Sequence, residues 1–205
     1  MSRLLLVRHG DTELNSRERY WGHSDVKLSK AGLKQAEKLR ERLASERIDV
    51  IYASDLERSW LTANIIAQKH RLEVSICPEL REFNFGAVEG LTFDEISHLH
   101  PELAEFWASR NPKLRFPGGE SLGDLRRRLN RFRQRLEKHT SQETILIVAH
   151  AGALRILLCQ LLGIGQYHWR QLRLNLASLS IVETYPERTV LSLLNDVSHL
   201  DSKLH

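Results

Sequence analysis

The chain has 205 residues, of which 41% are hydrophobic and 27% are charged, and it carries a formal net charge of +4 at pH 7. This length suits one α/β domain and is short for two, while the composition excludes a fibrous, a low-complexity and a mainly disordered chain. The positive charge favours an anionic partner but does not choose among a phosphorylated metabolite, nucleic acid and an acidic membrane surface.

Cysteine usage and the start of the chain indicate the compartment. Cys77 and Cys159 lie far apart, without the spacing of a disulfide framework or of a zinc site. We therefore expect two buried thiols in a reducing environment. The apolar run at 4–7 ends at Arg8 and is too short for a signal peptide or a membrane span. These observations predict a cytoplasmic protein.

Strands and helices alternate in the first part of the chain. The apolar run at 4–7 predicts a short buried strand, which ends where polar and flexible residues begin at Arg8. After Ser29, a good N-cap residue, apolar side chains recur at helical spacing and predict a helix through about residue 45. The next elements are a strand at 50–53, a helix at 56–70 and a strand at 74–77. This alternation is typical of a parallel sheet that helices cover on both faces.

The middle of the chain has a weaker pattern. Three prolines divide the stretch 91–117 into short helical pieces, and aromatic residues are frequent in it. We interpret the segment at about 91–120 as a lid-like insertion that covers a site.

The last part of the chain returns to a regular pattern. Between Ser121 and His139 one apolar stripe predicts a helix, and six arginines lie on its other faces. The following elements are a strand at 145–149, a helix at 153–162, and two strands at 176–184 and 190–194. Together they predict an α/β fold, a three-layer sandwich with a mostly parallel central sheet flanked by helices, as a single domain over 1–205.

Four strand ends or helix starts present side chains that can bind or attack a phosphate group. These are Arg8 with His9, Arg58, Glu82 and His150. Taken singly, each is more often a structural or surface residue than a functional one. Ligands of open α/β sheets bind beyond the carboxyl ends of the strands, so we expect these side chains to converge there. Their combination indicates a catalytic site.

The basic side chains of this set suit a phosphoryl group. Its transfer places charge on three equatorial oxygens, and fixed cations and donors stabilise that charge. Arg8, Arg58 and His150 can supply them, because a guanidinium stays charged and can bind two oxygens at once. Asn15 can add a neutral donor.

His9 and Glu82 suit the chemical steps. A neutral imidazole attacks phosphorus if one ring nitrogen is free and an acceptor holds the other. Nearby arginines disfavour a positive charge on His9 and so help to keep it neutral. Glu82 would protonate the leaving alcohol and later deprotonate the water that cleaves the phosphohistidine.

Several short motifs follow one another along nearly the whole chain. They are LLVRHGDT at 5–12 with Asn15 after it, LSKAG at 28–32, ASDLER at 53–58, LREF at 80–83, PGGES at 117–121 and VAH at 148–150. In sequence and order, this series resembles the signatures of the histidine phosphatase superfamily, in its phosphoglycerate mutase-like branch.

The resemblance implies a role for each residue of the set. His9 would be the phosphorylated residue and Glu82 the proton donor, and neither a metal ion nor another cofactor would take part. The phosphate pocket would consist of Arg8, Asn15, Arg58, His150 and Ala151. Many members have glycine directly after the second histidine, whereas here Ala151 precedes Gly152. Alanine retains the backbone N–H that would meet the phosphate.

The resemblance also narrows the activity. The insertion after Glu82 is shorter than in most mutases of the superfamily, and the stretch 82–86 is nearer to the phosphatase type. The nearest branch is that of the α-ribazole-5′-phosphate phosphatases of cobalamin biosynthesis, which makes α-ribazole 5′-phosphate the expected substrate. The alternatives are a 2,3-bisphosphoglycerate-dependent phosphoglycerate mutase, a broad-specificity phosphatase and a catalytically dead module that binds phosphorylated ligands.

Two further features are interpreted as structural. The arginine run at 126–135 is expected to be a solvated helix face and not a nucleic-acid site, because no aromatic residues alternate with the arginines. The histidine pairs of the chain lack a third ligand in sequence, so no metal site is expected. We expect a small-molecule phosphate ester as the partner, with no nucleic acid and no membrane, and we leave a homodimer open.

Overall fold

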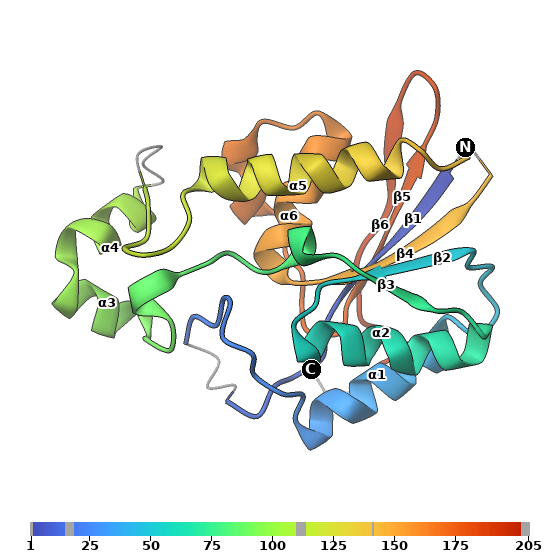
Figure 1. Cartoon of the computed structure of the whole chain (residues 1–205), viewed down its shortest axis with the longest axis horizontal. Helices are drawn as coiled ribbons and strands as arrows, with labels where there is room; N and C mark the ends of the chain where they lie inside the picture. Colours follow the sequence, from blue (N-terminus) through green and yellow to red (C-terminus); the bar gives the residue numbers. More distant parts are fainter. Residues whose placement is uncertain (1, 15–18, 110–113, 141, 202–205) are drawn as a thin grey trace.

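The structure, a computed structural model, describes residues 2–14, 19–109, 114–140 and 142–201 and is built around one sheet. The sheet has six strands in the order β3-β2-β4-β1-β5-β6 (Figure 1). The strands are β1 (Ser2–Arg8), β2 (Val50–Ala53), β3 (Val74–Ile76), β4 (Thr144–Ala149), β5 (Leu179–Thr184) and β6 (Thr189–Asp196). β5 runs antiparallel to both of its neighbours, and the other adjacent pairs are parallel. The predicted mostly parallel sheet is confirmed.

Helices cover both faces of this sheet and give the predicted three layers. The helices are α1 (Lys30–Arg42) and α2 (Glu57–His70) on one face, and α5 (Leu122–Leu136) and α6 (Ala151–Leu162) on the other (Figure 1). Side chains of β1 alternate between the two cores: Leu4 and Leu6 pack with α5 and α6, and Leu5 and Val7 with α1 and α2. Burial on both faces explains why this strand is apolar throughout.

The helix boundaries follow from local capping. The Ser29 hydroxyl accepts a hydrogen bond from the N–H of Gly32 at 3.0 Å and begins α1, which ends at Arg42, earlier than the predicted residue 45. Ser121 begins α5 in a capping box with Asp124. Within the described residues, none of the helices combines the length and apolar character that a membrane crossing needs.

The strand predicted at 176–184 begins later, at Leu179. Ala177 has a positive φ of 53°, in the left-handed region, which an extended strand does not use. Its N–H donates to the carbonyl oxygen of His9 at 3.0 Å. The segment before β5 therefore crosses the end of β1 and is fixed there.

The segment predicted as a lid-like insertion contains two short helices, α3 (Phe93–Leu99) and α4 (Pro101–Ala108), which lie beyond one end of the sheet (Figure 1). Two 3-10 turns lead into it, η1 (Pro78–Leu80) and η2 (Gly86–Val88). The indole of Trp107 packs edge-on against Phe83 and Phe116, with ring centroids 6.3 and 5.3 Å away. Aromatic packing thus joins the insertion to the chain segment that follows Glu82.

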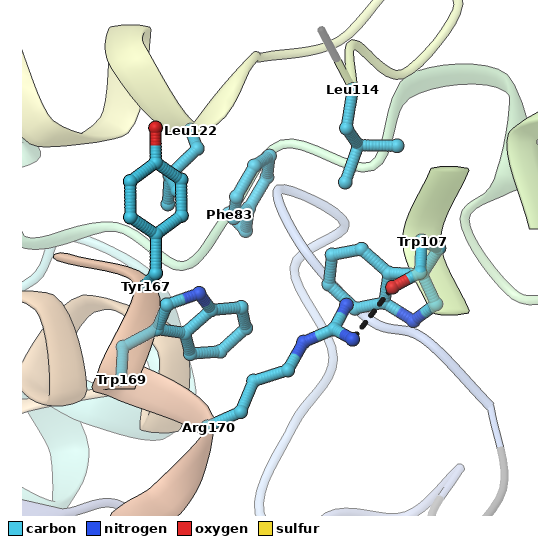
Figure 2. A pocket seen from close by; sticks show the side chains of 7 residues that line it. All are labelled: Phe83, Trp107, Leu114, Leu122, Tyr167, Trp169 and Arg170. Atoms are coloured by element: carbon cyan, nitrogen blue, oxygen red, sulfur yellow. Dashed lines mark hydrogen bonds between the residues drawn. The ribbon is translucent and has the colours of Figure 1, made fainter. Parts of the chain in front are cut away.

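A third 3-10 element, η3 (Gln166–Gln171), meets the insertion from the other side. Figure 2 shows Arg170 reaching from η3 to Trp107. The guanidinium carbon of Arg170 lies 4.0 Å from the centroid of the indole, and Nη1 donates to the carbonyl oxygen of Trp107 at 2.6 Å. A small apolar pocket lies between α4, the start of α5 and η3 (Figure 2).

Candidate active site

Two histidines leave the sheet side by side. β1 and β4 are parallel neighbours, and their register pairs Arg8 with Ala149, the last residue of each strand. The next residues are His9 and His150, whose ring centroids lie 4.9 Å apart. Both side chains are buried, with exposed fractions of 7% and 0%. The strand register therefore determines the proximity that the sequence could only suggest.

The contacts of His9 fix which of its ring nitrogens is free. Nδ1 lies 2.7 Å from the carbonyl oxygen of Gly10, and because that oxygen only accepts, Nδ1 carries the hydrogen. Burial, followed by the positive charges of Arg58 and Arg8, lowers the pKa of His9 well below its ordinary value. The ring is thus neutral at physiological pH, and the Nε2 lone pair is available as a nucleophile.

The guanidinium of Arg58 is held in place by two backbone carbonyl groups. It lies in the first turn of α2 with only 2% of its surface exposed. Its guanidinium donates to the carbonyl oxygens of Gly22 at 2.7 Å and Ser24 at 2.9 Å. Burial lowers the pKa of Arg58, and the negative charge of Glu82 opposes this shift. The side chain is therefore a fixed cation near the histidine pair.

Arg8 is the second fixed cation. Its Nη1 donates to the carbonyl oxygen of Leu174 at 2.7 Å, which orients the guanidinium beyond the end of β1. Burial lowers the pKa of Arg8 to about 10, with the charge of Glu82 acting in the opposite direction. At this pKa the side chain stays charged near neutral pH.

Several polar atoms of this site are buried without a hydrogen-bond partner among the described residues. They are Nε of Arg8, both ring nitrogens of His150 and Nε of Arg155. A buried polar group without a partner costs about 1–3 kcal/mol and calls for an explanation. A neutral His150 has one N–H donor and one acceptor nitrogen, and an anion with several acceptor oxygens, such as a phosphate group, has the chemistry that satisfies the N–H donors of this set.

Glu82 reaches the same site from the loop after η1. One carboxylate oxygen accepts from the N–H of Gly152 at 3.0 Å. The other accepts from the N–H groups of Ala153 at 3.2 Å and Phe83 at 2.8 Å. The carboxylate therefore sits on the positive N-terminus of α6, the helix that follows His150.

The contact of Glu82 with α6 requires glycine at position 152. A Cβ atom on Gly152 would lie 2.4 Å from Oε1 of Glu82. This gives a physical reason for the sequence Ala151-Gly152. The helix begins at Ala151, not at the predicted 153, because His150 with its extended backbone is already the N-cap. Ala151 thus presents its N–H at the helix N-terminus, where anions bind readily.

The structure brings together every described residue that was predicted for the site. Arg8, His9 and His150 extend from the carboxyl ends of β1 and β4, Arg58 from the start of α2, and Ala151 from the start of α6. Glu82 joins them through its contact with α6. Asn15 lies outside the described residues. The chemical roles of all these residues stay predictions.

One of the six arginines in the run at 126–135 was assigned wrongly to the solvated face. The side chain of Arg128 is only 11% exposed and forms an ion pair with Glu120, N to O 2.8 Å. Its guanidinium also donates to the carbonyl oxygen of Glu82 at 3.0 Å. Arg128 lies three residues after Leu125 and four before Phe132, two members of the apolar stripe. That spacing was the signal that it faces inward.

Arg155 is a further cation of the site that the sequence did not reveal. It lies on α6, one helical turn after Ala151. Burial lowers the pKa of Arg155, the charge of Glu82 raises it, and that of Arg173 lowers it. In the part of the chain that the structure describes, no three side chains of His, Cys, Asp and Glu gather closely enough to hold a metal ion.

Comparison with known proteins agrees with this geometry. The chain matches the family model of the histidine phosphatase superfamily (branch 1) over residues 4–197. Phosphoserine phosphatase 1 from Hydrogenobacter thermophilus is 35% identical over 200 residues, which cover 98% of this chain and 95% of that protein. Phosphoglycerate mutase-like protein 4 from Arabidopsis thaliana is 40% identical over 157 residues, which cover 75% and 68%.

A solved structure gives the same result for the fold. The crystal structure of the α-ribazole phosphatase from Shigella flexneri superposes with a TM-score of 0.88 at 30% sequence identity. The superposition covers 95% of this chain and 96% of that one. With a family match over nearly its whole length and phosphatases among its relatives, the chain belongs to branch 1 of the histidine phosphatase superfamily and is a phosphatase enzyme.

Proposed function

We propose that this enzyme hydrolyses a small-molecule phosphate monoester in two steps, through a phosphohistidine formed on Nε2 of His9. The observation that carries the proposal is the state of His9. The Gly10 carbonyl oxygen holds its Nδ1–H, its pKa is lowered, and the charges of Arg58 and Arg8 act on it. A neutral ring with a free Nε2 among fixed cations suits attack on a phosphate group.

In the first step, the Nε2 lone pair of His9 bonds to phosphorus while the bond between phosphorus and the ester oxygen breaks. The guanidinium groups of Arg8 and Arg58 stabilise the charge on the equatorial oxygens. His150, whose ring nitrogens are unpartnered among the described residues, adds a hydrogen bond. Glu82 carries a proton for this step and gives it to the departing oxygen.

In the second step, water takes the place of the leaving group. Glu82, now a carboxylate, accepts a proton from the water, whose oxygen bonds to phosphorus as the phosphorus–nitrogen bond breaks. The products are inorganic phosphate and neutral His9. The three hydrogen bonds that Glu82 accepts from N–H groups suit the carboxylate of this step.

The substrate that we propose first is α-ribazole 5′-phosphate. The sequence resemblance and the likeness to the α-ribazole phosphatase from Shigella flexneri support it. A specific observation favours a second class, phosphate esters that also carry a carboxylate. Arg155 is partly buried beside the catalytic cations, and its Nε has no partner among the described residues. The relative named phosphoserine phosphatase 1 is consistent with that class.

Phosphate release from a panel of esters tests the proposal. The panel contains α-ribazole 5′-phosphate, phosphoserine, 3-phosphoglycerate, sugar phosphates and nucleotides, with a chelator present throughout. A kcat/KM at least about tenfold higher for one ester identifies the class. Phosphate transfer from 2,3-bisphosphoglycerate to a phosphoglycerate without net release would overturn hydrolysis in favour of a mutase. The absence of both reactions would indicate a binding module.

The Arg155→Met variant separates the two substrate classes. If a carboxylate pairs with Arg155, the variant raises KM for phosphoserine about tenfold or more, as expected for the loss of a charge-assisted hydrogen bond. The KM for phenyl phosphate, which has no second charge, stays within about twofold. Equal changes for both esters would remove the reason for the second class.

A further inference from the structure

The guanidinium of Arg128 binds both one loop and the carboxylate of Glu120. Nη1 donates to the carbonyl oxygens of Glu79 at 2.7 Å and Arg81 at 2.8 Å. Nη2 donates to the carbonyl oxygen of Glu82 at 3.0 Å and to Glu120 at 2.8 Å, and Nε donates to Glu120 at 2.9 Å. All five guanidinium N–H bonds are therefore used. Three of them end on the backbone that carries Glu82.

Glu120 holds the other end of the same loop. Its carboxylate accepts from the N–H of Asn84 at 3.0 Å, and its own N–H donates to the carbonyl oxygen of Asn84 at 2.9 Å. The side chains of Arg128 and Glu120 are 11% and 16% exposed, so the bidentate pair is largely shielded from water. Together the two residues attach the loop at 79–84 to the start of α5.

Side chains of the loop also hold it, because Arg81 donates to Asp55 at 2.7 Å and the ring of Phe83 is buried, but its backbone has few further hydrogen bonds. The chain from Arg81 to Phe85 belongs to neither helix nor strand, so its carbonyl groups have no ladder partners. His23 adds one contact, with its Nε2 3.1 Å from the carbonyl oxygen of Glu82. Arg128 and His23 are thus the side chains that contact the carbonyl oxygen of Glu82 among the described residues, and Arg128 alone of the two also binds the carbonyl groups of Glu79 and Arg81.

We propose that Arg128, oriented by Glu120, is a positioning residue that places the carboxyl group of Glu82 for proton transfer. This inference rests on the proposed function, in which Glu82 protonates the departing oxygen. Arg128 touches the carbonyl oxygen of Glu82, and the carboxylate of Glu82 extends from there to the N-terminus of α6. A misplacement of about 1 Å in a catalytic group can lower a rate about 10²-fold.

The test uses two substrates that differ in their need for an acid. An alkyl phosphate has a strongly basic leaving oxygen and needs the proton, whereas 4-nitrophenyl phosphate needs it little. Rapid quenching measures the rate of His9 phosphorylation for both. In Arg128→Met we expect about a 10- to 100-fold loss with the alkyl ester and a loss of less than about threefold with the aryl ester. Arg131→Met, an exposed site on the same helix, is the control and should leave both rates unchanged.

A merely structural role makes a different prediction. If Arg128 only stabilised the fold, both substrates would lose activity equally, in proportion to the fraction of folded enzyme that circular dichroism reports. Removal of one partner of a buried ion pair can be strongly destabilising. If Arg128→Met does not fold, Arg128→Lys is measured in its place, because lysine keeps the charge but loses the fork. Glu120→Gln should show the same substrate preference, because the amide cannot accept both bonds of that fork.

A double-mutant cycle distinguishes failure of this inference from failure of the proposed function. In a Glu82→Gln background, Arg128→Met should cost less than about twofold more with the alkyl ester, because the acid is already absent. A full additional loss would overturn the positioning role. If Glu82→Gln itself lowers both substrates equally, the acid assignment is wrong. If Glu82→Gln loses more rate with the alkyl ester than with the aryl ester and Arg128→Met does not, the positioning role alone is wrong.

Discussion

We expect that a single methyl group added at position 152 lowers the activity of this enzyme strongly and its stability only slightly. In Gly152→Ala, the new Cβ would lie 2.4 Å from Oε1 and 3.3 Å from Cδ of Glu82, whereas ordinary contacts begin at 3.4 Å. The carboxylate must therefore retreat by about 1 Å, and a shift of this size can lower a rate about 10²-fold. Because the clash falls on the end of a side chain and not on backbone, the fold can accommodate it.

The effect on stability has two opposing parts. Alanine is favoured over glycine by about 1 kcal/mol in a helix interior, which is an upper bound at Gly152, the second residue of α6. Displacement of Glu82 weakens its hydrogen bonds to the N–H groups of Gly152 and Ala153, each worth about 1.5–3 kcal/mol because the acceptor is charged. If these bonds are partly retained, the free energy of unfolding falls by a net of about 1–3 kcal/mol. This loss is too small to unfold a typical domain.

The chain offers a matched control at Gly123. It is the second residue of α5, as Gly152 is of α6. A Cβ there would meet only the flexible end of Arg127 at 3.4 Å and Ser121 Oγ at 3.6 Å. Gly123→Ala should keep wild-type activity.

The assay is the rate of His9 phosphorylation, measured by rapid quenching together with urea unfolding. We expect Gly152→Ala to lose about 10²-fold with an alkyl phosphate and much less with 4-nitrophenyl phosphate, because the displaced group is the proposed acid. Wild-type rates with the alkyl ester in a folded Gly152→Ala variant would refute the reasoning. They would mean that Glu82 acts from a position that α6 does not define.

Three further predictions concern the reaction and its pH dependence. We expect mass spectrometry to find an acid-labile phosphoryl adduct on the quenched wild type, and His9→Ala should abolish both this adduct and turnover; a persistent adduct on another residue would contradict His9 as the nucleophile. Activity should survive exhaustive chelation, and orthovanadate should inhibit competitively and more tightly than phosphate; restoration of a lost activity by one metal ion would refute the first part. His9 and His150 have pKa values lowered from 6.5, so below that pH the unfolded chain binds protons that the folded chain does not. The free energy of unfolding should then fall on acidification below about pH 6.5, by up to about 1.4 kcal/mol per pH unit for each histidine. In urea titrations at several pH values, the free energy of unfolding should depend less steeply on pH in His150→Asn than in the wild type. An equal dependence would refute the lowered pKa of His150.

The sequence predicted the elements well where one physical signal dominated. The strand at 50–53 agrees with β2 in both bounds, because an apolar run between polar residues has clear ends. The strand at 176–184 began too early, because the left-handed backbone of Ala177 depends on its bond to the carbonyl oxygen of His9. Such a tertiary contact leaves no periodic signal in the sequence.

The same contrast between local signals and tertiary contacts applies to the site residues. Arg8, His9 and His150 could be predicted because their strands are apolar and end abruptly. The inward position of Arg128 could have been predicted from its spacing to Leu125 and Phe132, but the loop that it contacts could not, because only the folded chain brings that loop to α5. The contact between Glu82 and Gly152 could not be predicted, since it joins a loop and a helix start that only the folded sheet brings together.

The register of β1 against β4 has a consequence for how the active enzyme forms. β1 is the first strand of the chain, yet it is central in the sheet, and both of its partners, β4 and β5, are formed from the last third of the sequence. During synthesis the apolar β1 must wait unpaired until most of the chain has been made, which is the situation that slows folding and invites aggregation. The histidine pair cannot exist before that late pairing. Catalytic activity therefore reports completed folding, and a nascent chain that ends before β4 has no active site.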